Sequence, residues 1–229
     1  MPTNSIFEIH QRPSDSALVD SVWRTASGVD LDSFTSVAES HWGMVVTRQR
    51  GRIWLTVRGP ETRASQSPIP EEADFFGIVF KHGAFMPDLP TGTLVDAPIA
   101  LPGVSRRAFR LLGSAWHFPD FENADTFVDR LVHEGVLVTD SVVVEALEGR
   151  LPDLSLRSIQ RRFLRATGLT RGGLFQIERA RTAATLLERG VSILDAADEA
   201  GYADQSHLTR ALRRFWGYTP AQVLRGATL

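Results

Sequence analysis

The stretch Ile193–Pro220, ILDAADEAGYADQSHLTRALRRFWGYTP, holds two short helix-like segments on either side of Gly201. Ser192 is placed to act as the N-cap of the first segment, and Asp195 in its first turn suits the helix dipole. Glycine permits the positive φ that a sharp turn between two helices requires. The apolar residues of the first segment recur at i, i+3, i+4 and i+7, which predicts one packed face: Ile193, Ala196, Ala197 and Ala200.

The second segment is amphipathic, with Asp204 as its candidate N-cap. Its apolar side is predicted to be buried and consists of Leu208, Ala211, Leu212 and Phe215. Its opposite side carries Gln205, Ser206, Thr209, Arg210 and Arg213. Two short helices joined at a glycine are typical of a helix-turn-helix, whose second helix lies in the major groove of DNA. Side chains of these types reach base edges and phosphates. The alternative is a helical hairpin with an ordinary polar face.

A shorter version of this pattern lies upstream in LPDLSLRSIQRRFLRATGLT, residues 151–170. Ser155 is its candidate N-cap, and Gly168 is expected to end the helix. Three apolar residues are expected on one face: Leu156, Ile159 and Phe163. The other face presents Arg157, Gln160 and Arg161, with Arg162 and Arg165 flanking them. Arg162, Arg165, Arg213 and Arg214 are candidates for phosphate contact. The candidates for base contact are Arg157, Gln160, Arg161, Gln205, Ser206, Thr209 and Arg210.

A predicted helix, FQIERARTAATLLERG, connects the two patterns. Its apolar residues at helical spacing are Ile177, Ala180, Ala184 and Leu187. A helix of about 15 residues is roughly 22 Å long. Adjacent major grooves on one side of a duplex are about 34 Å apart. The connector and its flanking helices therefore have the right scale to present both candidate recognition helices to one side of DNA.

Charge is distributed unevenly along the chain. Residues 151–229 carry 12 arginines against 7 acidic residues, whereas residues 1–150 carry 13 basic residues against 20 acidic ones. A basic C-terminal part on a chain of net charge −2 indicates that only this part meets a polyanion. Charge alone leaves a solvated helical surface as the alternative.

The chain up to about residue 118 is predicted to form short strands and turns. Four runs are rich in β-branched and aromatic residues: SFTSVAES, HWGMVVTRQR, RIWLTVRG and ADFFGIVFKHG. Turn formers separate them at Arg50–Gly51, at residues 59–72 and at residues 86–92. Several short strands without intervening helices favour an antiparallel barrel or sandwich.

A predicted helix, NADTFVDRLVHEG, follows this strand-rich part. Asn123 is its candidate N-cap and Gly135 its candidate stop. Its apolar stripe of Phe127, Val128, Leu131 and Val132 is wide for a lone surface helix, so it packs either on its own β domain or on a second copy of the chain. Asp140 is then expected to cap a further helix, SVVVEALE, which Gly149 ends.

About 75 residues at the C-terminus resemble the DNA-binding domain of the AraC/XylS family of bacterial transcription regulators. The matching phrases are LSLRSIQRRFLRATGLT, IERARTAATLL and ILDAADEAGYADQSHLTRALRRFWGYTPAQ. The resemblance implies two helix-turn-helix motifs joined by a long helix. The first motif departs from the family pattern, because DSVVVEALEGRLPD replaces the usual alanine-rich helix and compact turn. Gly172-Gly173 also replaces better helix formers at the start of the connector.

The resemblance implies a cupin-like β domain at the N-terminus that binds a small molecule, a partner subunit or both. The expected fold is therefore α+β, with an antiparallel β barrel over residues 1–138 and an all-α domain with two helix-turn-helix motifs over residues 139–229. The expected function is sequence-specific DNA-binding transcription regulation. Expected partners are double-stranded DNA, a homodimer and RNA polymerase, with a small-molecule effector of unknown identity. The alternative is a β-barrel enzyme or small-molecule-binding protein whose helical tail makes protein contacts.

Several classes of chemistry lack their sequence patterns. The chain has no cysteine, and it shows no nucleophile elbow, phosphate loop or paired-carboxylate motif. The five histidines of the N-terminal part are scattered singly without a His-x-His pair and are each expected to be structural: His10, His41, His82, His117 and His133. We therefore expect no enzyme activity, catalytic residue, cofactor or bound metal. The first residues lack a signal-peptide core and no run has the length of a membrane span, so the sequence predicts a cytoplasmic protein.

Overall fold

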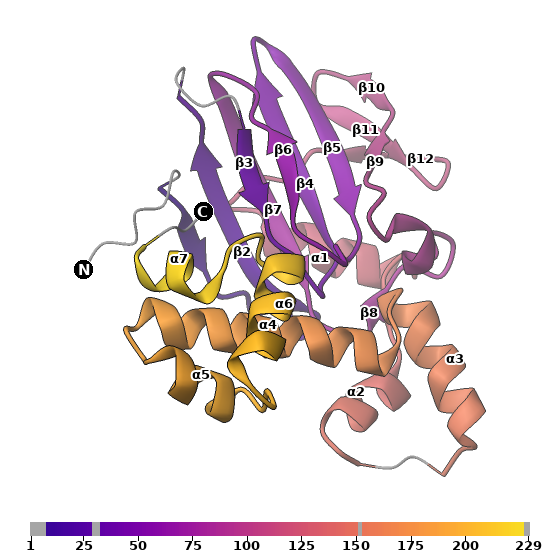
Figure 1. Ribbon diagram of the computed structural model, residues 1–229. Helices are drawn as coiled ribbons and strands as arrows, with labels where there is room; N and C mark the ends of the chain where they lie inside the picture. The colour runs from indigo at the N-terminus through magenta and orange to yellow at the C-terminus, as the bar shows by residue number, and fades with distance from the viewer. Residues whose placement is uncertain (1–7, 29–32, 151–152, 227–229) are drawn as a thin grey trace.

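The computed structural model describes residues 8–28, 33–150 and 153–226 (Figure 1). Antiparallel sheets occupy the N-terminal part and helices the C-terminal part, so the predicted α+β class is confirmed. The main sheet has the strand order β1 (His10–Arg12), β2 (Val19–Ala26), β7 (Ala73–Phe80), β4 (Gly43–Gln49), β5 (Arg52–Arg58) and β9 (Ile99–Leu101). All its neighbouring strands are antiparallel.

The apolar face of the main sheet is set by strand register. Ile78 on the central strand β7 pairs with Val22 on one side and with Met44 on the other, and Met44 pairs with Val57. Paired residues project to the same face of a sheet, so these four side chains form one apolar row. All four are almost fully buried in the core of the β domain.

A second layer covers this face. It consists of a three-stranded sheet, β10 (Gly103–Ser105), β11 (Ala108–Leu111) and β12 (Ser114–His117), and of helix α1 (Ala124–His133). Phe127, Val128 and Leu131 of α1 are buried in the same core, whereas Val132 is 41% exposed. The apolar stripe of α1 therefore packs on its own domain, which is the first of the two alternatives left open by the sequence.

Two local features near the strands bear on the sequence predictions. The predicted turn at Arg50–Gly51 is confirmed, since both residues have positive φ, 46° and 76°, between β4 and β5. The segment expected to be only a turn, residues 59–72, contains strand β6 (Ser65–Pro68). This strand pairs with β3 (Ser33–Ser36) over four residues, so a tertiary partner overrides weak β propensity.

Asn123 precedes α1 as predicted, but it does not cap the helix by a side-chain hydrogen bond. Its Oδ1 instead accepts a hydrogen bond from the backbone N–H of Asp120, 2.9 Å away. The predicted stop is confirmed, because Gly135 follows the helix with a φ of 70°.

The described residues of the C-terminal part form six helices: α2 (Ser141–Leu147), α3 (Leu156–Thr167), α4 (Arg171–Glu188), α5 (Ile193–Glu199), α6 (Gln205–Phe215) and α7 (Pro220–Leu224). The connector α4 spans 18 residues and is longer than predicted. Its N-cap is Thr170, whose Oγ1 accepts from the N–H of Gly173, so the glycine pair lies inside the first turn. The predicted apolar face of α4 is buried, and its members are Ile177, Ala180, Ala184 and Leu187.

Strand β13 (Val138–Thr139) pairs with β8 (Ala84–Phe85) directly before α2 begins. The predicted division between residues 138 and 139 falls within this strand. The division therefore stays a prediction.

The β domain contacts the C-terminal ends of both α3 and α6. The N–H of Ala38 donates to the carbonyl of Phe215 at 2.7 Å, and the N–H of Ala64 donates to the carbonyl of Arg214 at 2.8 Å. On α3, the hydroxyl of Thr91, in the short 3-10 helix η1 (Thr91–Leu94), donates to the carbonyl of Ala166 at 3.2 Å. The last carbonyls of a helix have no partner within the helix, so these contacts from the β domain satisfy them.

Candidate nucleic-acid interface

Helices α5 and α6 meet at the predicted glycine turn. Gly201 has a φ of 72°, in the left-handed region that favours glycine. Ser192 caps α5 by accepting from the N–H of Asp195 at 3.2 Å, and Asp204 caps α6 by accepting from the N–H of His207 at 2.6 Å. The caps and the turn predicted for the second motif are confirmed.

Tyr202 fills the angle between the two helices, as predicted, and is only 5% exposed. The guanidinium of Arg179, from α4, lies 4.3 Å from the centre of the Tyr202 ring and donates to the carbonyl of Gly201 at 3.2 Å. Burial raises the pKa of the Tyr202 hydroxyl, against the opposing charge of Arg179. Contacts from the connector helix α4 therefore hold the turn in place.

The outward face of α6 is polar and open. Gln205, Ser206, Arg210 and Arg213 are exposed, and Thr209 is half-buried. The hydroxyl of Thr209 donates to the carbonyl of Gln205 at 2.8 Å. Within the described part of the chain, the guanidinium groups of Arg210 and Arg213 form no hydrogen bond or ion pair, so both are free to meet a ligand.

The first motif has a looser arrangement. Asp140 caps α2 and Ser155 caps α3, as predicted, but residues 148–155 separate the two helices, and residues 151 and 152 lie outside the described ranges. Arg157, Gln160 and Arg161 are exposed on α3. The guanidinium groups of Arg157 and Arg161 have no polar partner among the described residues.

One residue of α3 that is predicted to be buried is exposed. Leu156 was expected beside Phe163 on the buried face, but Leu156 is 74% exposed while Phe163 is 1% exposed. Helix α2 has seven residues and ends at Leu147, before the long loop, and neither core cluster of the described residues includes Leu156. The amphipathic spacing of α3 is correct, but its N-terminal turn projects beyond the core.

Three of the predicted arginines have partners inside the protein. Arg162 Nη1 lies 3.2 Å from both carboxylate oxygens of Asp140, and the Arg165 guanidinium lies 5.3 Å from the centre of the Phe85 ring. The Arg214 guanidinium lies 4.8 Å from the centre of the ring of Phe215. These side chains are exposed as well, so their contacts fix them at the surface instead of removing them from it.

Both candidate recognition helices have the same sense relative to the β domain. Their C-terminal ends contact it, and their N-terminal ends point away from it, towards the lower side of the molecule in Figure 1. The connector α4 runs from the end of α3 to α5, and α6 crosses it in this view. The capped N-terminal halves of α3 and α6 are therefore the parts presented outward.

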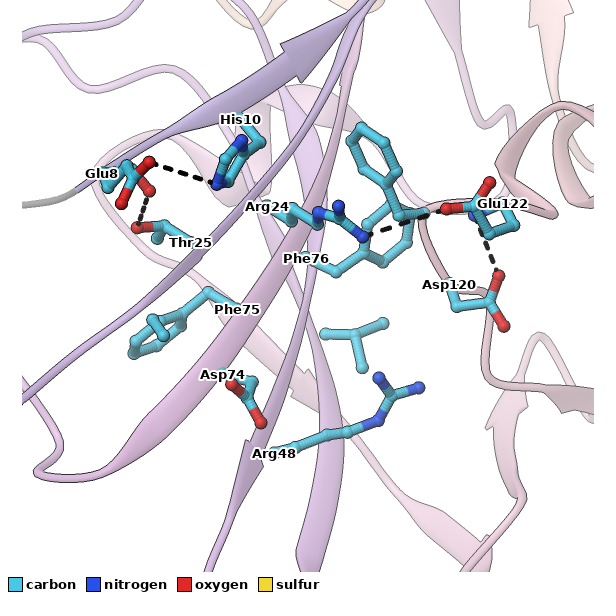
Figure 2. Close-up of a pocket in the computed structure, with 13 residues that line it drawn as sticks. Glu8, His10, Arg24, Thr25, Arg48, Asp74, Phe75, Phe76, Asp120 and Glu122 are labelled. Carbon is cyan, nitrogen blue, oxygen red and sulfur yellow. Dashed lines mark hydrogen bonds and ion pairs between the residues drawn. The ribbon is translucent and has the colours of Figure 1, made fainter.

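A cavity of about 590 Å³ opens at one end of the main sheet (Figure 2). Arg24, Arg48 and Phe76 line it from the apolar face of the sheet, and Phe121 and Glu122 line it from the loop before α1. The Arg24 guanidinium lies 4.6 Å from the centre of the Phe121 ring and 3.9 Å from a Glu122 carboxylate oxygen. Among the described residues Arg48 has no ion-pair partner. The cavity combines aromatic walls with charges of both signs, since Asp74, the cross-strand neighbour of Arg48, and Asp120 line it as well.

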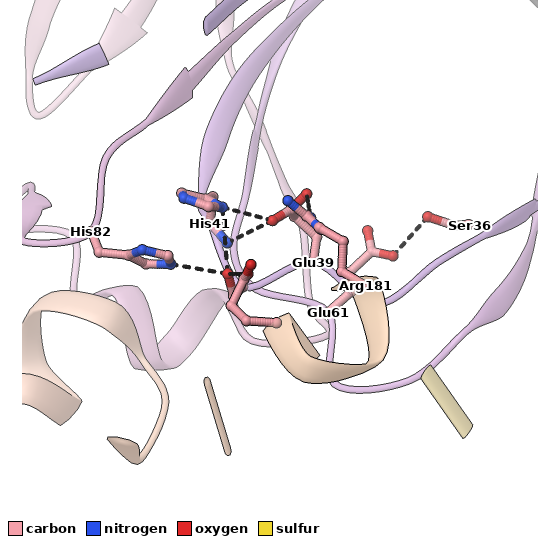
Figure 3. Close-up of polar contacts among 8 residues, drawn as sticks. Ser36, Glu39, His41, Glu61, His82 and Arg181 are labelled. Carbon is pink, nitrogen blue, oxygen red and sulfur yellow. Dashed lines mark hydrogen bonds and ion pairs between the residues drawn. The ribbon is translucent and has the colours of Figure 1, made fainter. Parts of the chain in front are cut away.

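A polar cluster joins the β domain to α4 (Figure 3). Arg181 of α4 lies 2.5 Å from Glu39, and Glu39 accepts a hydrogen bond from His41 Nδ1 at 2.8 Å. Burial raises the pKa of Glu39, but the hydrogen bond from His41 and the charge of Arg181 outweigh it and lower this pKa to about 2. Burial, together with the charge of His41, lowers the pKa of His82 to about 4.

The sequence did not reveal this cluster. Each histidine was expected to be isolated and structural, yet the rings of His41 and His82 stack with centroids 3.8 Å apart. Both lie beside Glu178 of α4. Residues so far apart in the chain give no short-range signal, and only the approach of α4 to the β domain brings them together.

Comparisons with known proteins agree with the helical part. A family model described as a helix-turn-helix domain matches residues 152–226. The HTH-type transcriptional regulator RipA of Corynebacterium glutamicum is 37% identical over 93 residues, covering 40% of this chain and 28% of that protein. This chain thus spans little more than a quarter of that relative's length.

Solved structures of ToxT from Vibrio cholerae O395 are similar over nearly the whole chain, at low identity. One matches with a TM-score of 0.40 and 10% identity, covering 95% of this chain and 97% of that chain. Another, bound to (E)-4-(8-methylnaphthalen-1-yl)but-3-enoic acid, matches with a TM-score of 0.42 and 11% identity, covering 96% and 99%.

The caps, the glycine turn and the matched family model define residues 152–226 as a helix-turn-helix domain. The match to this family model agrees with the helix-turn-helix resemblance seen in the sequence. No helix in the described ranges is long and apolar enough to span a membrane.

Proposed function

We propose that this chain is a sequence-specific DNA-binding transcription regulator whose α3 and α6 enter two adjacent major grooves of one duplex. One observation carries the proposal: two N-capped helices point the same way from the β domain, and each bears arginines without an internal partner. In a helix-turn-helix the N-terminal part of the second helix contacts base edges. The α4 connector, 18 residues or about 27 Å, spans much of the distance between adjacent major grooves.

We assign base contacts to Arg157, Gln160, Arg161, Gln205, Ser206, Thr209 and Arg210. Arg213 is assigned to phosphate, since it lies further towards the C-terminal end of α6. Arg165 is assigned to phosphate from its fixed position over Phe85. Phosphate contacts set the register of a protein on DNA, and base contacts set its sequence preference.

Salt dependence of duplex binding tests this proposal against the alternative of a helical tail that makes only protein contacts. A protein that neutralises several phosphates loses affinity linearly on a logarithmic salt scale, with a slope of about −0.9 per phosphate on B-DNA. We expect a slope corresponding to several phosphates on a duplex selected from a random library, and a shallower slope for Arg213→Ala. Arg106→Ala, an exposed arginine of the β10–β11 turn, is the matched control and should keep the wild-type slope. Weak retention of every duplex without selection of a sequence would contradict the proposal.

The cavity of the β domain is proposed to hold a small-molecule effector. Its aromatic walls and the guanidinium of Arg48, which forms no ion pair among the described residues, suit a ligand with an apolar body and an anionic group. The fluorescent probe 8-anilinonaphthalene-1-sulfonate has this chemistry. We expect Arg48→Ala to weaken binding of this probe, while Arg106→Ala leaves it unchanged. Equal affinity of the Arg48→Ala and Arg106→Ala variants for the probe would mean that the probe binds outside this cavity.

A second copy of the chain and RNA polymerase are the further proposed partners. Phe127, Val128 and Leu131 of the α1 stripe, one candidate dimer face, are buried in the core of their own domain, so a dimer would use another surface. Sedimentation of the full chain at tens of micromolar, with and without the selected duplex, tests the homodimer. A chain that stays monomeric under both conditions would exclude it.

A further inference from the structure

Three potential metal ligands from the two parts of the chain converge at the junction in Figure 3. His41 and His82 belong to the β domain, and Glu178 belongs to α4. A ring nitrogen of each histidine and a carboxylate oxygen of Glu178 all lie within 4.8 Å of one another. We propose that His41, His82 and Glu178 form a binding site for a divalent transition-metal ion of the zinc type, which links the β domain to α4.

The donor set suits this class of ion. Two imidazoles and one carboxylate are a common zinc ligand set, which leaves the fourth tetrahedral position for another oxygen. Soft or thiolate-dependent metals are disfavoured because the chain has no cysteine. Magnesium and calcium prefer all-oxygen sites, so two imidazoles disfavour them as well.

The surroundings of His41 resemble the outer shell of a metal site. His41 Nδ1–H donates to Glu39 Oε1 at 2.8 Å, which fixes the ring and leaves Nε2 as the donor to an ion. Such carboxylate–histidine pairs orient metal-bound imidazoles and raise their basicity. Glu39 is held in turn by Arg181 at 2.5 Å. The charges of Glu39, Glu178 and Arg181 sum to −1, which favours a divalent cation.

Ser40 connects two of the same groups by hydrogen bonds. Its hydroxyl donates to Glu178 Oε1, and His82 Nε2 lies 2.9 Å from Ser40 Oγ. Since a hydroxyl has one proton to donate, His82 Nε2–H is the donor in the second contact. A metal ion would replace this hydroxyl as the common partner of His82 and Glu178.

Coordination requires one ring to leave the stack. The two imidazole planes are only 28° from parallel, with centroids 3.8 Å apart. An ion lies close to the plane of each imidazole that binds it, so two stacked rings cannot both point at one ion. Both histidines are half-buried, so a rotation of His82 away from His41 does not have to displace core residues. Binding of the ion would therefore replace the ring stacking and the Ser40 hydrogen bonds at this junction with metal coordination.

The test is metal binding to the full, untagged chain, with no DNA present, so its outcome is independent of the proposed function. Zinc competition against a chromophoric chelator should give one equivalent per chain. Glu178→Gln keeps the shape and a hydrogen-bond acceptor but removes the anionic ligand, and His82→Ala removes an imidazole. We expect each variant to lower zinc affinity at least tenfold, a loss typical of damaged metal sites.

Matched controls separate this site from adventitious binding. Glu188→Gln changes an exposed carboxylate at the C-terminal end of α4, and His117→Ala removes an exposed histidine of β12. Both should bind zinc as the unmodified chain does. Cobalt offers a second readout on the unmodified chain, because tetrahedral nitrogen and oxygen ligation gives a strong visible absorption band. Less than one zinc equivalent, no tetrahedral cobalt band, or equal affinity in Glu178→Gln and Glu188→Gln would each overturn the proposal.

Discussion

Seven arginines on α3 and α6 separate into two groups by what their guanidinium groups contact. Arg162, Arg165 and Arg214 each have a partner in the protein, a carboxylate or an aromatic ring. The other four, Arg157, Arg161, Arg210 and Arg213, have no such partner among the described residues. A side chain that already contacts its own protein loses part of its conformational entropy on folding. A side chain without such a contact loses that entropy when it binds DNA. The two groups should therefore respond differently to truncation.

Arg161→Ala and Arg162→Ala form a neighbouring pair that tests this difference. Arg161→Ala should weaken binding of the selected duplex by about 1–3 kcal/mol, with an unchanged melting temperature. Arg162→Ala should lower the free energy of unfolding by about 1 kcal/mol, because Asp140 is 9% exposed and loses its cationic partner. Duplex titration and thermal melting of both variants provide the measurement. A stability loss in Arg161→Ala equal to that in Arg162→Ala would contradict the assignment.

At the level of residues, the sequence predicted what is local. Asp204 and Ser155 could be identified as caps because a cap acts on amides two or three residues away. The pairing of Arg162 with Asp140 could not be predicted, because α2 and α3 approach each other only after folding. The stacking of His41 on His82 and the approach of Glu178 were hidden for the same reason.

At the level of elements, the glycine turn between α5 and α6 determines how the second motif is built. Gly201 has a φ of 72°, and a Cβ added there would meet no atom within 4 Å. The cost of a side chain at this position is therefore backbone strain alone. In the looser first motif Gly149 also has a positive φ, 78°, but residues 148–155 separate the two helices.

Gly201→Val should lower the free energy of unfolding by about 1–2 kcal/mol, since a branched residue rarely adopts positive φ. Gly172→Ala is the control, because Gly172 lies in the first turn of α4 with open space around it and ordinary φ. That substitution should be neutral or slightly stabilising. Chemical denaturation of the two variants provides the comparison. A Gly201→Val protein as stable as the wild type would show that this glycine is not needed for the turn.

The sequence predicted some helices and strands correctly and missed others. The second motif, α4 and four strands of the β domain follow from periodicity and turn residues. Strand β6 was not predicted, because Ser65–Pro68 has little β propensity and pairs with β3 only in the folded chain. The exposed position of Leu156 was missed because periodicity identifies an apolar face but not whether another helix covers it.

At the level of the whole molecule, the β domain satisfies the last carbonyls of both candidate recognition helices. The amides of Ala38 and Ala64 bind the end of α6, and the hydroxyl of Thr91 binds the end of α3. The backbone also approaches closely here, since a Cβ on Gly217 would lie 2.8 Å from Thr35 Cγ2. A conformational change in the β domain would therefore directly alter the contacts that hold the C-terminal end of α6.

Gly217→Val should loosen this junction, because the added side chain would collide with Thr35 and Ala64. We expect the amides of Ala38 and Ala64 to exchange hydrogen at least tenfold faster in this variant. Gly201→Val imposes similar backbone strain without the collision, and should leave the exchange of both amides at the wild-type rate. Equal acceleration in the two variants would mean that exchange reports general destabilisation and not undocking of α6.

The central claim is that α3 and α6 contact two adjacent major grooves of one duplex. A hydroxyl-radical and base-methylation footprint on a duplex selected from a random library tests it most directly, with wild type, Arg161→Ala and Arg210→Ala compared on the same site. We predict two protected patches on one face of the duplex, about 10 base pairs apart, as expected for one helical turn. Arg161→Ala should lose base protection in one patch only, and Arg210→Ala in the other only. A single protected patch, or the same patch lost in both variants, would contradict the account.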